Sequence, residues 1–112
     1  MGGVLGILLG SASQVSVVMS PGDIYASGTV SSSNTFPESI GVSGGVATAY
    51  NWAVVSNSGG GWSIQSGQGT ANAVFLVTGV GPSGDAIAQI KCDVTVNGTV
   101  YTVNATLEYQ RL

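Results

Sequence analysis

The charged side chains are the first candidates for chemistry, and they are few and scattered. The 112-residue chain has no histidine, and its charged residues are Asp23, Glu38, Asp85, Asp93, Glu108, Lys91 and Arg111. Without histidine, the commonest general base and the usual partner of a serine or cysteine nucleophile are missing. Paired-carboxylate catalysis needs two acids in one cleft, whereas these acids are expected mostly at turns or on polar faces. We therefore predict that the protein is not an enzyme.

The turns are the candidate sites for a metal ion, a cofactor or a nucleic acid. Asp23 and Asp85, each beside a glycine, are the candidate calcium ligands, but Ca²⁺ takes about six to eight oxygens and neither turn concentrates acids. The glycine runs at 59–61 and 79–81 lack the lysine of a phosphate-binding loop. A net charge of −3 offers no basic stripe for phosphates. We predict no metal, no cofactor and no nucleic-acid partner.

The single cysteine and the two tryptophans are the remaining reactive or adhesive side chains. Cys92 is the only cysteine, so no internal disulfide can form. It lies in an alternating apolar run, where we expect a buried, structural thiol with a raised pKa. Trp52 shares a strand face with Tyr50 and Val54, which favours the core. Trp62 stands between a glycine and a serine, so we predict that it is the surface aromatic of the two and the candidate side chain for binding a ligand beside the neighbouring loop.

The clearest structural signal is the dipeptide Asn97-Gly98, which separates two runs of alternating apolar residues. This pair suits the positive φ angles of a two-residue type I′ turn, so it fixes the register of a hairpin. A one-residue slip would bury Lys91 and Asp93 instead of the apolar residues. The predicted pairs on the apolar face are Val96 with Thr99, Val94 with Tyr101, Cys92 with Val103, Ile90 with Ala105, Ala88 with Leu107 and Ala86 with Tyr109.

Turn signals recur at short spacing along the rest of the chain, and no stretch has sustained helical periodicity. This pattern predicts an all-β fold, with Phe75 facing inward. The other expected strands are 14–19, 24–30, 38–42, 47–55, a short one around 62–64, and 71–78, and the expected loops include 31–37, 56–61 and 79–85.

The first twelve residues differ from the rest, because they form an apolar run. It falls short of the about 20 residues that span a bilayer and has no cation ahead of it, as a signal peptide would. We assign a single domain to residues 13–112, since a chain of this length supports one core. An exposed apolar run is an aggregation hazard on a free monomer, so we predict that it contacts another subunit. The candidate contact residues are Val4, Leu5, Ile7, Leu8 and Leu9.

Residues 45–109 resemble the C, E, F and G strands of immunoglobulin-like domains, on the segment Tyr50-Asn51-Trp52, the Phe75 strand and the final hairpin. Trp52 and Cys92 match that family's strand-C tryptophan and strand-F cysteine, while the second cysteine of its disulfide is missing. The same segments, preceded by Gly44-Gly45, resemble the Ig-like and PKD-like modules of tailed-bacteriophage structural proteins. The resemblance implies an antiparallel immunoglobulin-like β-sandwich of about seven to nine short strands. The expected core includes Tyr50, Trp52, Phe75, Cys92 and Tyr101.

This resemblance, with the low charge, leads to several functional hypotheses. The first is a non-enzymatic virion protein, assembled in the host cytoplasm, that joins a tail tip, fibre or baseplate and contacts other virion proteins and copies of itself. Capsid decoration is its nearest variant. The second is a module that binds a host-surface glycan or receptor through Trp62 and the loops 56–62 and 79–85. The third is a pilin or surface-layer subunit that uses its apolar N-terminal segment as a donated strand or as a membrane-proximal anchor.

Overall fold

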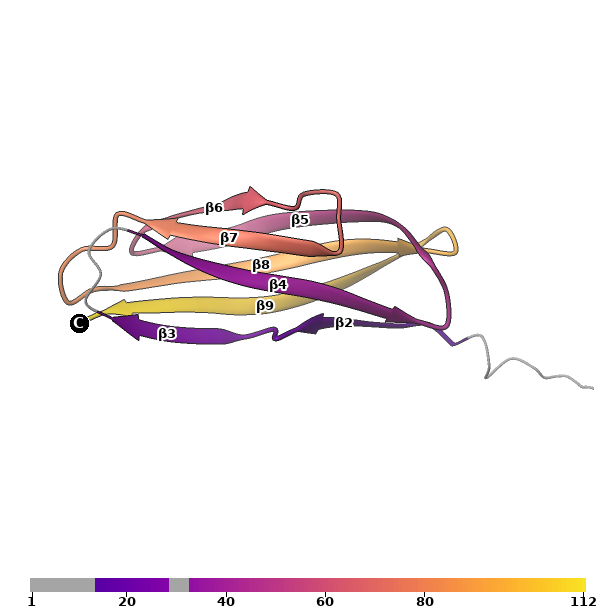
Figure 1. The fold of residues 1–112 in the computed structure, drawn as a ribbon, viewed down its shortest axis with the longest axis horizontal. Helices are drawn as coiled ribbons and strands as arrows, with labels where there is room; N and C mark the ends of the chain where they lie inside the picture. Colours follow the sequence, from indigo (N-terminus) through magenta and orange to yellow (C-terminus); the bar gives the residue numbers. More distant parts are fainter. Residues whose placement is uncertain (1–13, 29–32) are drawn as a thin grey trace, which may run out of the picture.

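A computed structural model describes residues 14–28 and 33–112, and this part of the chain contains eight β-strands and no helix. The strands form two four-stranded sheets packed face to face (Figure 1). This confirms the predicted all-β sandwich. The strands are β2 (Ser16–Ser20), β3 (Ile24–Gly28), β4 (Ser33–Ser43), β5 (Ala47–Ser58), β6 (Gly61–Ser66), β7 (Asn72–Thr78), β8 (Asp85–Val96) and β9 (Thr99–Arg111).

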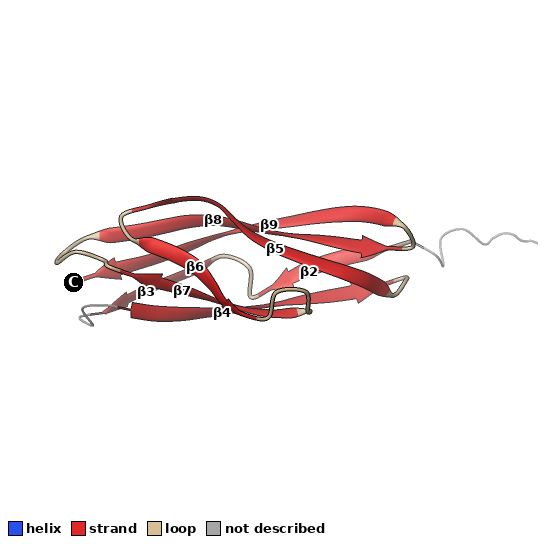
Figure 2. Ribbon diagram, turned by 90° about the horizontal axis from the view of Figure 1, so that it is seen from above, coloured by secondary structure: helices blue, strands red, loops and turns tan. Residues whose placement is uncertain are grey.

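The strand order is β2-β4-β7-β6 in what we call the first sheet and β3-β9-β8-β5 in the second. Neighbours are antiparallel except β3 and β9, which are parallel. The consecutive strands β2 and β3 run in the same direction but belong to different sheets. The chain crosses from one sheet to the other at residues 21–23. Figure 2 shows the strands running lengthwise, with loops and turns at both ends and with the β2–β3 and β6–β7 connections along the length of the sandwich.

The final hairpin has the predicted register. Asn97 and Gly98 adopt φ angles of 54° and 78°, as a type I′ turn requires. All the predicted pairs are observed, from Val96 with Thr99 beside the turn to Ala86 with Tyr109. Local turn chemistry and the apolar alternation therefore selected the same pairing.

The core also follows the prediction for the strands that resemble C, E, F and G. Trp52 on β5 lies opposite Cys92 on β8, and both are buried. The Trp52 ring meets Phe75 of β7 edge-on, at 5.8 Å between ring centroids. Tyr50 and Tyr101 are half-buried and pack against this cluster. The tryptophan thus bridges the two sheets, because β5 and β7 belong to different ones.

The loop expected at 31–37 is wrong from Ser33 onward, because β4 begins there and runs for 11 residues, while residues 31–32 lie outside the described residues. Serine, asparagine and proline are typical of loops, but here tertiary contacts override that tendency. Phe36 pairs with Phe75 across the sheet and is 1% exposed. Burial of this aromatic ring stabilises a strand that the local composition does not favour.

Candidate interaction surfaces

The charged side chains other than Glu38 lie on the second sheet or beside it. Lys91 and Asp93 lie on the outer side of β8 and form a salt bridge of 3.2 Å. The Thr102 hydroxyl donates to Asp93 at 2.6 Å and, with Lys91, lowers the pKa of that carboxyl. Asp23, in the crossover between β2 and β3, accepts a hydrogen bond from the Thr106 amide of β9 at 2.8 Å. The remaining surface charges lie at the ends of β8 and β9: Asp85, Glu108 and Arg111.

The outer side of the first sheet, which we call the uncharged face, carries no charged side chain among the residues that the structure describes. Its residues alternate with the buried ones along each strand. They are Ser16, Val18 and Ser20 of β2, Thr35, Pro37, Ser39, Gly41 and Ser43 of β4, Asn72, Val74, Leu76 and Thr78 of β7, and Gly61, Ser63 and Gln65 of β6. Most of these side chains are small.

A shallow hollow of about 280 Å³ lies on this face, over β2 and β4. Gly41 and Val18 line it, together with Ser16, Val42 and Ser43. Val18 pairs directly with Gly41 across the two strands and is 56% exposed. A Cβ atom added at Gly41 would meet nothing within 4 Å. The exposed side chain of Val18 therefore lies next to a hollow over Gly41, which has no side chain to fill it.

The prediction that Trp62 is a surface aromatic is wrong. The ring is 8% exposed and packs on Phe36, with ring centroids 5.2 Å apart. Trp62 lies in strand β6, where a short strand is expected around 62–64, but its glycine and serine neighbours point outward while the indole points inward. Its Nε1 is buried without a hydrogen-bond partner. A ring in this position offers no face for a sugar to stack on.

The two loops proposed for ligand binding lie at one end of the sandwich, but only one has its predicted extent. The chain from Gly79 to Gly84 links β7 to β8, close to the expected loop 79–85. The expected loop 56–61 is shorter, because β5 continues to Ser58 through a register shift after Val54. Only residues 59–60 separate β5 from β6.

The predicted assembly-contact residues Val4, Leu5, Ile7, Leu8 and Leu9 lie outside the described residues. The structure does show where the chain enters the sandwich. The Gln14 backbone lies so close to Gly44 that a Cβ there would be 2.0 Å from the Gln14 oxygen, and Gly44 has a φ of +77°. Gly44 belongs to the connection between β4 and β5, at the same end of the molecule as the Asn97-Gly98 turn (Figure 1). We call this end the hairpin pole.

Glu38 was expected to be a solvated carboxylate, but it points into the sandwich and is 1% exposed. Its Oε1 accepts a hydrogen bond from the Gly22 amide at 2.8 Å, and its Oε2 is buried without a partner. Burial raises its pKa to about 7, the Gly22 hydrogen bond opposes the rise, and Asp23 adds to it. The alternation of Phe36, Glu38 and Ile40 would have revealed this position if β4 had been recognised as a strand. The carboxyl group holds the crossover between the sheets.

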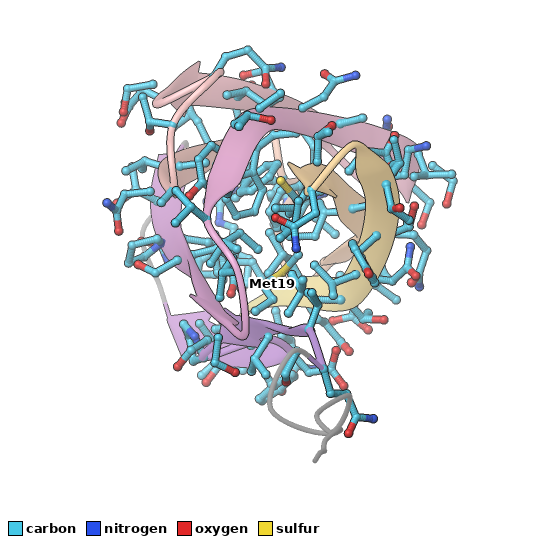
Figure 3. All side chains as sticks on the ribbon, turned by 90° about the vertical axis from the view of Figure 1, so that its right-hand side faces the viewer. Met19 is labelled. Carbon is cyan, nitrogen blue, oxygen red and sulfur yellow. The ribbon has the colours of Figure 1, made fainter. Side chains whose placement is uncertain are left out.

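Strand β2 contributes to the core up to the crossover. Met19, near the end of β2, packs against the buried cluster, and its side chain lies between the sheets in the end-on view of Figure 3. The last inward-facing side chain of β2 therefore lies just before the chain changes sheets.

The Gln68 side chain, from the connection between β6 and β7, covers the centre of the open edge of β5. The Gln68 side chain accepts from the Trp52 amide at 2.8 Å and donates to the Trp52 carbonyl at 2.7 Å. The indole of Trp52 donates to the Thr70 carbonyl at 2.7 Å. The amide of Gln68 thus takes the place of a neighbouring strand. An edge strand with unpaired backbone groups invites pairing with another chain, and this contact occupies those groups at the centre of β5.

The buried thiol has the predicted environment. Cys92 is fully buried, and burial raises the pKa of its thiol to about 11. The described residues hold no group of three or more histidine, cysteine or acidic side chains placed to bind a metal ion. In the same part of the chain, no helix has the length and apolar character needed to cross a membrane.

The strand arrangement defines the class of fold, an immunoglobulin-like β-sandwich, and a solved structure shares it. The chain is similar to the crystal structure of the S-layer protein SbsC domains 4 and 5, with a TM-score of 0.50 and 15% sequence identity. The match covers 85% of this chain and 51% of that one, so the chain spans about half the length of the solved structure. No protein-family model and no curated protein matches the sequence. At this identity the likeness shows the fold alone.

Proposed function

We propose that this protein is a non-enzymatic structural module that acts through protein–protein contacts in a large assembly. The observation that carries the proposal is the position of the two ends of the described chain. Gln14 lies at the hairpin pole beside Gly44. At the opposite end, the Leu112 amide donates to the Gly28 carbonyl at 2.7 Å (Figure 1). A module attached at one pole projects its whole length away from the attachment.

The attachment in this proposal is the apolar segment 1–12, which precedes β2 and is a hazard if exposed on a free monomer. The resemblance of the Trp52 and Cys92 strands to modules of tailed-phage structural proteins makes a tail tip, fibre or baseplate the first candidate assembly. Capsid decoration is the nearest variant, since it needs the same kind of anchor. Buried Trp62 removes the main argument for a glycan-binding role.

A surface layer is the second candidate assembly, and the observation in its favour is the structural likeness to the SbsC domains. The two candidates differ in where the protein accumulates. Mass spectrometry of purified virus particles and of cell-envelope fractions from the same culture would find the chain in one or the other. Presence in neither fraction would contradict both candidates.

Deletion of residues 1–12 tests the anchor. We expect the shortened chain to fold, as judged by circular dichroism, and to be absent from the purified particles or envelopes. A matched control replaces the same residues by a Gly/Ser segment of equal length, which keeps the length and removes only the apolar side chains. Unchanged incorporation of both variants would overturn the proposed anchor.

A further inference from the structure

We infer that the uncharged face is a self-association surface, on which two copies pack their first sheets together around a two-fold axis beside Val18 and Gly41. This inference deepens the proposed function, because it names a surface and a partner for a module that works by protein contacts. The partner is a second copy of this chain. Three observations support it: the charge of the face, its shape, and the obstruction of the β5 edge at which a strand of a second copy could otherwise pair.

The charge distribution favours a second copy with its uncharged face turned inward. The chain has a net charge of −3, and its surface charges belong to the second sheet or to the crossover beside it. Two second sheets brought together would oppose surfaces that each carry more carboxylates than cations. Two uncharged faces brought together desolvate no charge, and burying an unpaired charge is strongly unfavourable.

In the face-to-face arrangement the like charges are also far apart. Sheets pack about 10 Å from one another, so four stacked sheets put the two charged surfaces about 30 Å apart. The Debye length in physiological salt is about 8 Å, so repulsion over this distance is largely screened. The uncharged face is therefore the surface through which copies with the same net charge approach at the lowest electrostatic cost.

The shape of the face is self-complementary around Val18 and Gly41. In a two-fold contact, residue i of one copy meets residue j of the other, and the reverse contact is identical. Val18 projects beside the hollow of about 280 Å³ over Gly41. A two-fold axis between these neighbours places each Val18 in the hollow of the other copy. The surrounding serine side chains are small and let the two sheets approach.

One other mode of self-association, addition of a strand at the β5 edge, is obstructed. Gln68 already pairs with the backbone amide and carbonyl of Trp52 on that edge. A second copy would have to displace these hydrogen bonds before it could pair with β5. Packing through the uncharged face requires no such displacement.

The size of the face predicts a weak dimer. Strands lie about 4.8 Å apart and rise about 3.4 Å per residue, so a four-stranded face as long as β7 covers about 450 Å². A standard interface buries about 800 Å² on each partner. Such a contact has little effect in dilute solution, but it contributes where an assembly holds copies close together. This agrees with a module that works in an array.

Sedimentation velocity of the full chain, from micromolar to millimolar concentration, tests the inference with a matched pair of variants. Val18 on the first sheet and Val100 on the second are 56% and 59% exposed. We expect Val18→Lys to raise the dimer dissociation constant by about tenfold or more, because two lysines meet at the axis. Val100→Lys is expected to leave it unchanged. Gly41→Lys should act like Val18→Lys, and the open space above Gly41 lets the chain fold normally.

The comparison of the two valines separates this surface from association through the N-terminal segment, since both variants retain residues 1–12. Equal effects of Val18→Lys and Val100→Lys would overturn the inference, and so would a wild-type chain that stays monomeric at millimolar concentration. Added salt should leave the dimer intact, because no ion pair crosses the interface, and loss of the dimer in salt would also contradict it. The measurement uses purified chain alone. A negative sedimentation result would therefore overturn the self-association surface, whereas a negative particle-incorporation result would overturn the proposed anchor.

Discussion

Replacement of Glu38 by glutamine should abolish a pH dependence of stability that the wild-type protein shows near neutrality. The folded protein raises the pKa of this carboxyl from its ordinary value of 4.5 to about 7. The folded state therefore favours the protonated form. The contribution of this carboxyl to the free energy of unfolding is fully present below pH 4.5 and is lost as the pH rises through about 7. The protein is therefore least stable, as far as Glu38 is concerned, above about pH 7.

The magnitude follows from the pKa difference. One pKa unit corresponds to about 1.4 kcal/mol, so the rise of about 2.5 corresponds to about 3 kcal/mol in total. Between about pH 5 and about pH 8.5 the free energy of unfolding should fall by about 2.5 kcal/mol. This is a large part of the stability of a small domain, which is about 5–15 kcal/mol. The chain has no histidine, the side chain that would otherwise change its charge in this pH range. The pKa of Asp93 is lowered from 3.8 and that of Cys92 is raised from 9.0 to about 11, so in the folded protein both groups titrate outside this window.

Glutamine keeps the shape of the side chain and can still accept the Gly22 hydrogen bond through its oxygen, but it carries no charge. We expect the free energy of unfolding of Glu38→Gln to be flat over this window and to exceed that of the wild type at about pH 8.5. Urea titrations followed by fluorescence of the buried Trp52 and Trp62 measure it. Glu108→Gln makes the same chemical change on the outer side of β9 and should retain the wild-type fall. Parallel pH profiles for the wild type and Glu38→Gln would refute the reasoning.

Three further predictions concern the edge, the turn and the thiol. Gln68→Ala removes both hydrogen bonds to the Trp52 backbone, so urea titration should show that the free energy of unfolding falls by about 1–3 kcal/mol. Because the β5 edge is then open, gel filtration should show new oligomers. The control variant Gln65→Ala should show neither change. Gly98→Ala forces alanine into a φ of 78° and should lower the free energy of unfolding by about 1 kcal/mol. The control Gly41→Ala places a methyl group in open space within a strand, so it should leave the free energy of unfolding unchanged or raise it. Equal effects of the two substitutions would contradict the turn geometry. Cys92 should react with a thiol reagent only in denaturant, and fast labelling of the native protein would show that it is accessible.

The elements that the sequence predicts well are those specified by neighbouring residues. The turn at Asn97-Gly98 needs positive φ angles, which these two residue types tolerate, and the runs beside it alternate with a period of two. Both signals are local, so they specified the pairing of β8 with β9 and the burial of Cys92. The placement of Trp52 and Phe75 in the core followed from the same alternation.

The elements that the sequence predicts poorly depend on partners far away in the chain. The segment around Phe36 has the composition of a loop, and it is a strand because Phe36 pairs with Phe75 on β7 and packs on Trp62 of β6 within the first sheet. Trp62 was placed on the surface from its small neighbours, although an inward and an outward residue always alternate in a strand. The burial of Glu38 follows from the same unrecognised strand.

The sequence by itself determined the all-β class, the hairpin register and the shortage of charge. Only the tertiary structure decided how strands are shared between two sheets, because backbone hydrogen bonds between distant segments leave no local pattern. That division put every surface charge on or beside the second sheet and left the first with an uncharged outer face. It also brought Gln68 to the edge of β5 and Glu38 to the crossover of β2 and β3. The hollow beside Val18 arises in the same way, since Gly41 faces this valine only after β2 and β4 have paired.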